Sequence, residues 1–192
     1  MDEAGHELYN RERERAWALR LADTRSHTQG AVGDEPMIID QRVTIPAPAE
    51  RIWTLLMDVP AVSRCVPGIE SIDKLDDDHF AGTMKVKVGP VALTLGGKVA
   101  VAERDRDNWT ARLEMRAADK RIPGSVTTKV TLRLEPRGDQ ATELAIHTDA
   151  AILGKLGEFG QAVMLKKADQ ILDEFARCLA RQVGAATPTG GD

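Results

Sequence analysis

The chain has 192 residues, enough for one well-cored domain with an appendage but short for two large domains. Its 26 basic and 30 acidic residues give a formal net charge of −4, which argues against nucleic acid as a partner. Aromatic residues make up only 4% of the chain and apolar residues 42%, so aliphatic side chains and methionine must line any core or cavity. No apolar run approaches the ~20 residues that cross a bilayer and the amino terminus lacks a signal-peptide pattern, so we expect a cytoplasmic protein.

The first 36 residues differ in composition from the rest of the chain. They are rich in glutamate and arginine, contain no lysine, and end in a Gly- and Pro-containing linker. Between Glu7 and Arg25 the spacing predicts a partly amphipathic helix. Residues 1–36 are therefore predicted to be an exposed extension, with a docking helix for a partner protein or for the main domain as the alternative.

From residue 37 onward the pattern predicts a series of strands and helices. A strand at 38–45 precedes a helix at 50–57 and a second short helical piece that ends at 65–68. Six further strands then follow, at 69–75, 80–88, 91–103, 109–117, 126–134 and 142–152. A long helix at 155–183 and a short disordered tail at 184–192 complete the predicted order.

Period-2 alternation in these strands predicts a sheet with one apolar and one polar face. The long helix carries an apolar stripe with helical spacing, so we expect it to cover the apolar face. The adjacent Gly96 and Gly97 predict a bulge or a sharp bend in their strand. The fold class expected from this order is α+β, a curved antiparallel sheet wrapped around a long C-terminal helix.

Candidate chemical sites are few. Cys65 and Cys178 lie far apart and outside any CxxC or Cys/His cluster, so neither a disulfide framework nor a zinc site is indicated. His147 falls on the polar-face parity of its strand, which disfavours a catalytic role. The turn at 76–78 lacks a calcium-loop pattern and is interpreted as solvated. Glycines at 154, 157 and 160 favour a close loop passage over an anion site. No catalytic and no metal-binding residues are predicted.

Four motifs carry a resemblance to a known family. They are Pro46-Ala47-Pro48-Ala49-Glu50-Arg51-Ile52-Trp53, Arg64-Cys65-Val66-Pro67-Gly68-Ile69-Glu70-Ser71, Lys85-Val86-Lys87-Val88-Gly89-Pro90-Val91 and Gly154-Lys155-Leu156-Gly157-Glu158-Phe159-Gly160. On these motifs, residues 37–183 resemble a START-like (SRPBCC) domain with the helix-grip fold. The second and third are closest to the G subunits of carbon monoxide dehydrogenase.

This resemblance implies a non-catalytic accessory protein of a molybdenum-containing dehydrogenase. It also implies that a lipophilic ligand such as a quinone is carried between sheet and helix, with no tightly bound cofactor and with peripheral contact at the inner face of the membrane. The alternative of the same fold is a polyketide cyclase-like or hydrolase-like enzyme. That alternative requires an inward-facing acid or base such as His147 or Glu70.

A curved sheet cannot contact one straight helix everywhere, so we expect an apolar pocket, against the alternative of a filled core. Methionine suits such a pocket because its flexible thioether adapts to different guests. Parity selects nine lining residues, namely Met84, Val86, Leu113, Met115, Val130, Ile146, Phe159, Val163 and Met164.

Overall fold

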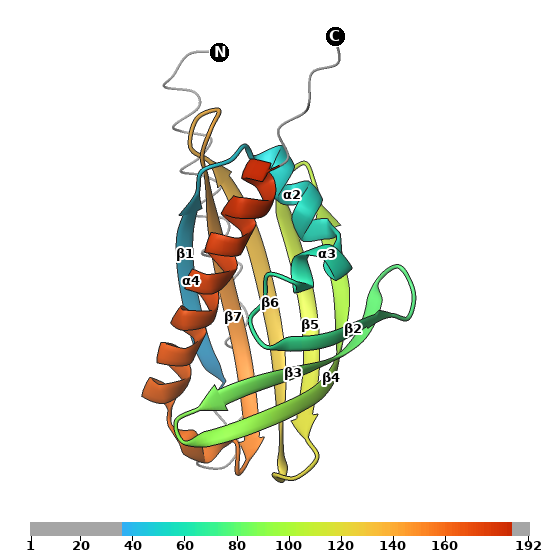
Figure 1. The fold of residues 1–192 in the computed structure, drawn as a ribbon, viewed down its shortest axis with the longest axis vertical. Helices are drawn as coiled ribbons and strands as arrows, with labels where there is room; N and C mark the ends of the chain where they lie inside the picture. Colours follow the sequence, from blue (N-terminus) through green and yellow to red (C-terminus); the bar gives the residue numbers. More distant parts are fainter. Residues whose placement is uncertain (1–35, 186–192) are drawn as a thin grey trace, which may run out of the picture. The chain divides into compact units, whose positions relative to one another are not determined.

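The structure, a computed structural model, describes residues 36–185. Seven strands form one antiparallel sheet in the order β1-β7-β6-β5-β4-β3-β2 (Figure 1). Their bounds are Met37–Ile45, Ile69–Lys74, His79–Val88, Val91–Asp105, Thr110–Asp119, Gly124–Pro136 and Thr142–Gly154, from β1 to β7. The helix predicted in the extension lies outside the described residues, as does most of the predicted tail.

Along the chain, two α-helices lie between β1 and β2, and one follows β7. Helices α2 (Ala49–Met57) and α3 (Val59–Ser63) follow β1 directly. The side chain of Asp58 caps α3, because one of its carboxylate oxygens accepts a hydrogen bond of 3.0 Å from the backbone N–H of Ala61. Helix α4 (Gln161–Ala185) follows a short 3-10 turn and packs mainly against β1, with further contacts to α2 and β3 (Figure 1). This is the α+β arrangement that the sequence predicts.

The last helix begins six residues later than predicted, at residue 161 instead of 155. Residues 157–159 form a 3-10 turn, and Gly160 before the helix has φ of +79°. Backbone in that region cannot continue a right-handed helix, and glycine adopts it without a steric penalty. At its other end the helix runs on to residue 185, beyond the predicted end at 183.

The glycine pair in β4 does not form the predicted bulge. Pairing with β3 and β5 runs without interruption through Gly96 and Gly97, and the register shift in β4 lies between Val101 and Glu103. Gly97 is required for a different reason. A Cβ at this position would lie 2.4 Å from the carbonyl oxygen of Arg116 and 2.8 Å from the Cβ of Ala117. Gly97 therefore permits the close approach of β4 to β5.

Substitution of the two neighbouring glycines should affect stability differently. We expect Gly97→Ala to lower the free energy of unfolding by about 1–3 kcal/mol, because the added methyl group meets backbone that must shift. Gly96→Ala is the matched control, since its Cβ would meet nothing within 4 Å, and should change stability by less than about 0.5 kcal/mol. Urea unfolding of both variants measures the difference, and equal stability of the two would contradict the close approach.

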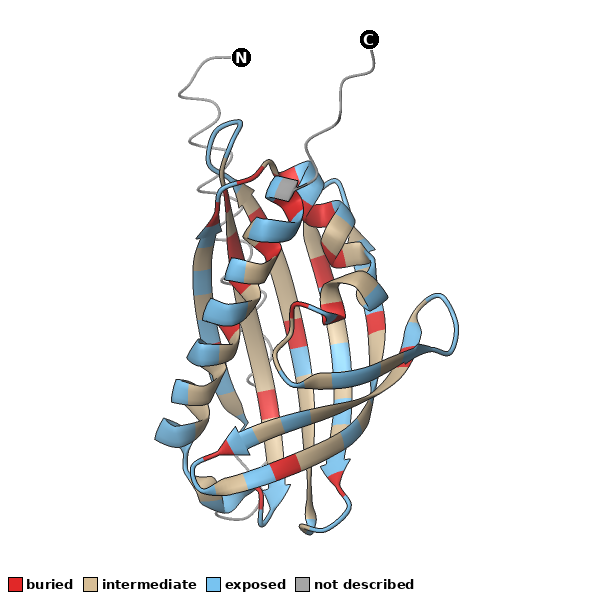
Figure 2. Ribbon diagram, in the orientation of Figure 1, coloured by how far each residue is buried: buried red, intermediate tan, exposed pale blue. Residues whose placement is uncertain are grey.

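The main hydrophobic core lies where α2, the end of α4 and the central strands meet (Figure 2). Ile52 of α2, Leu144 of β7 and Leu179 of α4 are completely buried there. Trp53 packs edge-to-face against Trp109 with ring centroids 5.7 Å apart and an interplanar angle of 77°. Trp53 thereby fixes α2 onto the domain.

The sequence-based expectation that the two cysteines form no disulfide framework is wrong. Cys65, two residues after α3, forms a disulfide with Cys178 of α4, and the Cα atoms lie 5.2 Å apart. That separation is within the range that a disulfide requires. The two residues are 113 positions apart in the chain, and only the return of α4 past α3 brings them together. The bond therefore ties α4 to the segment between α3 and β2.

Candidate functional site

The candidate site is the inner face of the sheet, the face on which α4 packs. Strand pairing defines this face residue by residue, because side chains two apart on a strand share one side. Leu113 of β5 pairs with Val130 of β6, which pairs with Thr148 of β7. On the same side, further along these strands, lie Ala111 and Leu134, which belong to the core that α4 covers. The apolar parity predicted from the sequence is therefore the inner face.

The core on this face is divided into two clusters. The first cluster lies around α2 and the C-terminal half of α4 and includes the buried Ile45, Ile52, Ala111, Leu134, Leu144 and Leu179. The second cluster lies at the other end of the sheet and is centred on Val88, Leu93 and Leu156. Neither cluster contains the residues that lie between them on the central strands.

We name the residues between the two clusters the middle rows, because they form two adjacent rows across β4, β5, β6 and β7. One row is Val99, Met115, Thr128 and Ala150; the other is Val101, Leu113, Val130 and Thr148. Val101, Val130 and Ala150 are buried, whereas Met115 and Leu113, at the centre of the seven-stranded sheet, are only partly buried. The inner face thus has an apolar strip at its centre that is not packed into either cluster.

The nine predicted lining residues are distributed over these regions. Three lie in the middle rows, namely Leu113, Met115 and Val130. Met84 of β3 is partly buried and in neither cluster. Ile146 packs against the first cluster, whereas Val86, Phe159 and Met164 pack against the second. Val163, on the first turn of α4, is 41% exposed. The structure thus brings the strand residues of the set onto one face and leaves Val163 at the surface.

Sequence reasoning missed one polar residue at the centre of the strip. Among the described residues, the hydroxyl oxygen of Thr128 is the one buried side-chain oxygen or nitrogen without a hydrogen-bond partner. Thr128 lies directly opposite Met115 of β5 and Ala150 of β7. The signal available in the sequence was a threonine at an inward-facing position between Val126 and Val130.

A second inward-facing polar residue, Asp119, is fully satisfied. Its carboxylate accepts hydrogen bonds from the backbone N–H groups of Thr94 at 2.6 Å, Arg121 at 2.7 Å and Ile122 at 3.3 Å. These bonds, led by that from Thr94, lower the pKa of Asp119 below its ordinary value. A lowered pKa means that the carboxylate stabilises the fold near neutral pH and loses this effect as the pH falls through the folded-state pKa. Asp119 therefore fixes the turn after β5.

The family model for the G subunit of carbon monoxide dehydrogenase (CoxG) matches residues 42–184, about three quarters of the chain. The chain belongs to the CoxG family. The matched segment contains α2, α3, the six strands from β2 to β7, nearly all of α4 and the last four residues of β1. No match was found among the curated proteins.

Several solved structures share the fold of this domain. A conserved protein from Geobacillus kaustophilus is 19% identical, with a TM-score of 0.71 over 78% of this chain and 97% of that one. A START superfamily protein from Mycobacterium smegmatis is 15% identical, with a TM-score of 0.61 over 78% and 99%. The Zhui aromatase/cyclase from Streptomyces sp. R1128 is 13% identical, with a TM-score of 0.61 over 82% and 100%. At these identities the likeness concerns the fold alone.

The two residues on which an enzymatic reading depends do not face the inner side of the CoxG domain. His147 lies on the outer face of β7, where its Nδ1 is 2.7 Å from a carboxylate oxygen of Asp40 on β1. Glu70 of β2 is exposed and forms an ion pair of 2.7 Å with Lys85 of β3. A general acid or base must lie within hydrogen-bond reach of its substrate, and neither side chain could reach a molecule held against the middle rows.

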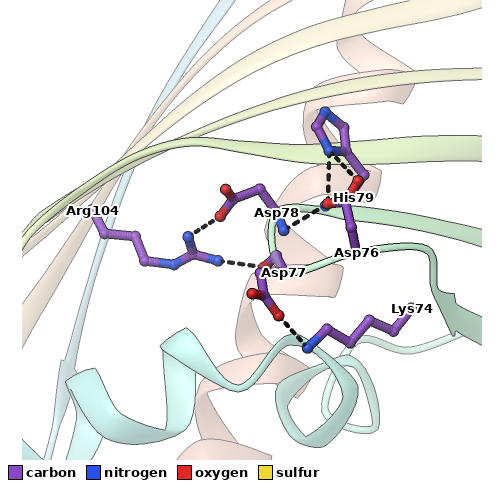
Figure 3. Close-up of polar contacts among 6 residues, drawn as sticks. All are labelled: Lys74, Asp76, Asp77, Asp78, His79 and Arg104. Carbon is purple, nitrogen blue, oxygen red and sulfur yellow. Dashed lines mark hydrogen bonds and ion pairs between the residues drawn. The ribbon is translucent and has the colours of Figure 1, made fainter.

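The aspartates of the acidic turn between β2 and β3 are bound by nearby protein groups (Figure 3). Asp76 accepts from the backbone N–H of Asp78, and this bond contributes most to lowering the pKa of Asp76. Lys74 binds Asp77 at 2.7 Å and lowers the pKa of that carboxyl, while Arg104 of β4 pairs with Asp78. Within residues 36–185 no group of acidic, histidine or cysteine side chains has the arrangement of a metal site. The turn is the solvated structural element that the sequence predicts.

Two of the three glycines at the end of β7 and after it, Gly154 and Gly157, allow the loop to pass close to the sheet, as predicted, whereas a Cβ on Gly160 would meet nothing within 4 Å. Gly154 has φ of +67°, and a Cβ there would lie 2.8 Å from the carbonyl oxygen of Pro123. A Cβ on Gly157 would lie 3.1 Å from the carbonyl oxygen of Ile152. The loop therefore passes close to the end of the sheet and places Leu156 in the second cluster. No helix within the part of the chain that the structure describes is long and apolar enough to cross a membrane.

Proposed function

We propose that this CoxG-family protein is a non-catalytic carrier that holds a lipophilic molecule, such as a quinone, between the sheet and α4. The observation that carries the proposal is the divided core, in which the middle rows present valine, leucine and methionine side chains that pack into neither cluster. Ligand sites in proteins are mostly apolar with a small number of polar groups. The middle rows have this composition.

The energetics favour a guest of moderate size. Burial of apolar surface contributes roughly 25 cal/mol per Å², so a guest that buries a few hundred Å² gains several kcal/mol before the entropic cost of binding. Leu113 and Met115 gain as well, because the ligand covers side-chain surface that is exposed in the free protein. Methionine in this position permits adaptation to guests of different shape.

The partner proposed is a molybdenum-containing dehydrogenase in the cytoplasm. The support is the family itself, which is named for a component of carbon monoxide dehydrogenase. A lipophilic electron carrier resides in the membrane, so the proposal includes peripheral contact with the inner membrane face, where the ligand would be collected or returned. No tightly bound cofactor is required in this scheme, because the redox chemistry belongs to the partner enzyme and to the ligand.

Thermal unfolding in the presence of a short-chain quinone tests the proposal. Ubiquinone-1 is added to the full-length protein, which is first stripped of bound lipid on a hydrophobic resin. A ligand that binds only the folded state stabilises it by about 2.7 kcal/mol at a hundredfold excess over Kd, so the melting temperature should rise with quinone concentration. An unchanged melting temperature with ubiquinone-1 and also with a menaquinone analogue would overturn the quinone carrier.

A further inference from the structure

The hydroxyl group of Thr128 is buried and has no hydrogen-bond partner within the fold. Strand β6 is paired on both sides, with β5 and with β7, and the register is unbroken around Thr128. The side chains directly opposite Thr128 are those of Met115 and Ala150. On β6 itself, the nearest side chains on the same face are Val126 and Val130, each two residues away. Three of these four side chains are hydrocarbon, and the thioether of Met115 is only a weak acceptor.

A buried hydroxyl without a partner is costly. Mutational data put the cost of such a group at about 1–3 kcal/mol, whereas valine has nearly the same shape and would complete this apolar wall without it. A water molecule could satisfy the hydroxyl only if it found further polar partners, and the one other hydroxyl in the middle rows is that of the diagonal neighbour Thr148. A ligand that brings its own polar group into the middle rows would satisfy the buried hydroxyl of Thr128 once the flexible side chain of Met115 opposite it moves aside.

We propose that Thr128 is the specificity-determining residue of the site and that its hydroxyl donates a hydrogen bond to a carbonyl oxygen of the lipophilic ligand. The inference rests on the proposed function and adds the chemical class of the ligand, a largely apolar molecule with a hydrogen-bond acceptor in or next to its ring system. Selection works because the apolar rows bind any lipophilic guest, while only one with an acceptor at the level of Thr128 also compensates the buried hydroxyl.

Three variants separate this role from a structural one. Thr128→Val removes the hydroxyl and keeps the shape, Thr128→Ser keeps the hydroxyl, and Thr127→Val makes the same change on the outer face of the same strand. Each full-length protein is titrated with ubiquinone-1 and with a hydrocarbon of similar size that carries the same isoprenoid chain but no oxygen. The thermal stability of each ligand-free protein is measured in parallel.

We expect Thr128→Val to weaken ubiquinone-1 binding about tenfold, equivalent to about 1.4 kcal/mol, and to leave hydrocarbon binding unchanged. Thr128→Ser should retain most of the affinity, and Thr127→Val should behave as the wild type. The ligand-free Thr128→Val protein should be at least as stable as the wild type, because an uncompensated polar group has been removed.

Two results would overturn the inference alone. Undiminished ubiquinone-1 affinity in Thr128→Val, with the hydrocarbon bound equally by both proteins, would show that the hydroxyl does not contact the ligand. A loss of stability in ligand-free Thr128→Val would show that the hydroxyl is bonded within the protein. If neither probe binds the wild type, the carrier function itself fails and the role of Thr128 falls with it.

Discussion

Replacing Cys65 and Cys178 together by alanine is expected to lower the free energy of unfolding by about 2–5 kcal/mol. The disulfide joins positions 113 residues apart and so restricts the unfolded chain strongly. It also holds α4 to the segment after α3, at the end of the fold where the first cluster is buried. Urea unfolding of the double variant and of the wild type under non-reducing conditions measures the effect.

Reductant provides the control for this experiment. A thiol-free reductant should destabilise the wild type by a similar amount and should leave the double variant unchanged, because only the wild type has a bond to lose. Two reactive thiols in the denatured, unreduced wild type would contradict the disulfide. Disulfides are uncommon in the reducing cytosol, so a thiol count on acid-quenched cells also tests the predicted cytoplasmic location.

Met115→Trp is expected to weaken ligand binding strongly without unfolding the protein. The indole would occupy the space in front of the middle rows, where Met115 is only partly buried and packs into neither cluster. We expect the affinity for ubiquinone-1 to fall at least tenfold, or about 1.4 kcal/mol, and the stability of the ligand-free protein to change by less than about 1 kcal/mol. Calorimetric titration and urea unfolding measure the two quantities.

The same variant distinguishes a pocket from a filled core. In a filled core the larger side chain would force neighbouring groups apart and cost about 1–3 kcal/mol of stability. Glu114→Trp is the matched control, because the adjacent residue of β5 lies exposed on the outer face. It should leave both affinity and stability close to the wild-type values. A destabilised Met115→Trp protein with ubiquinone-1 affinity equal to that of the wild type would contradict the proposed site.

Sequence patterning predicted the parts of the fold that depend on local periodicity. Strand parity placed Leu113, Met115 and Val130 on one face, and the register confirms it because period-2 alternation follows directly from strand geometry. The same parity put His147 outward, where it pairs with Asp40. The α+β class followed from the order of these elements and from the apolar stripe of the last helix.

Features that depend on non-local contacts could not be predicted in the same way. The pairing of Cys65 with Cys178 depends on how α4 returns past α3, which no local pattern encodes. The role of Gly97 depends on the backbone of β5 opposite it, whereas the sequence alone predicted a bulge or a sharp bend. The division of the core, and with it the uncompensated hydroxyl of Thr128, depends on which rows α4 reaches.

The most direct test of the carrier function is the content of the protein as isolated from its native host. Full-length protein is purified without detergent, extracted with organic solvent, and the extract is quantified by mass spectrometry against an extract of the Met115→Trp variant. The account predicts a lipophilic molecule that contains a carbonyl group, enriched in the wild type and approaching one molecule per chain. An extract that contains no such molecule above the level found with Met115→Trp would contradict it.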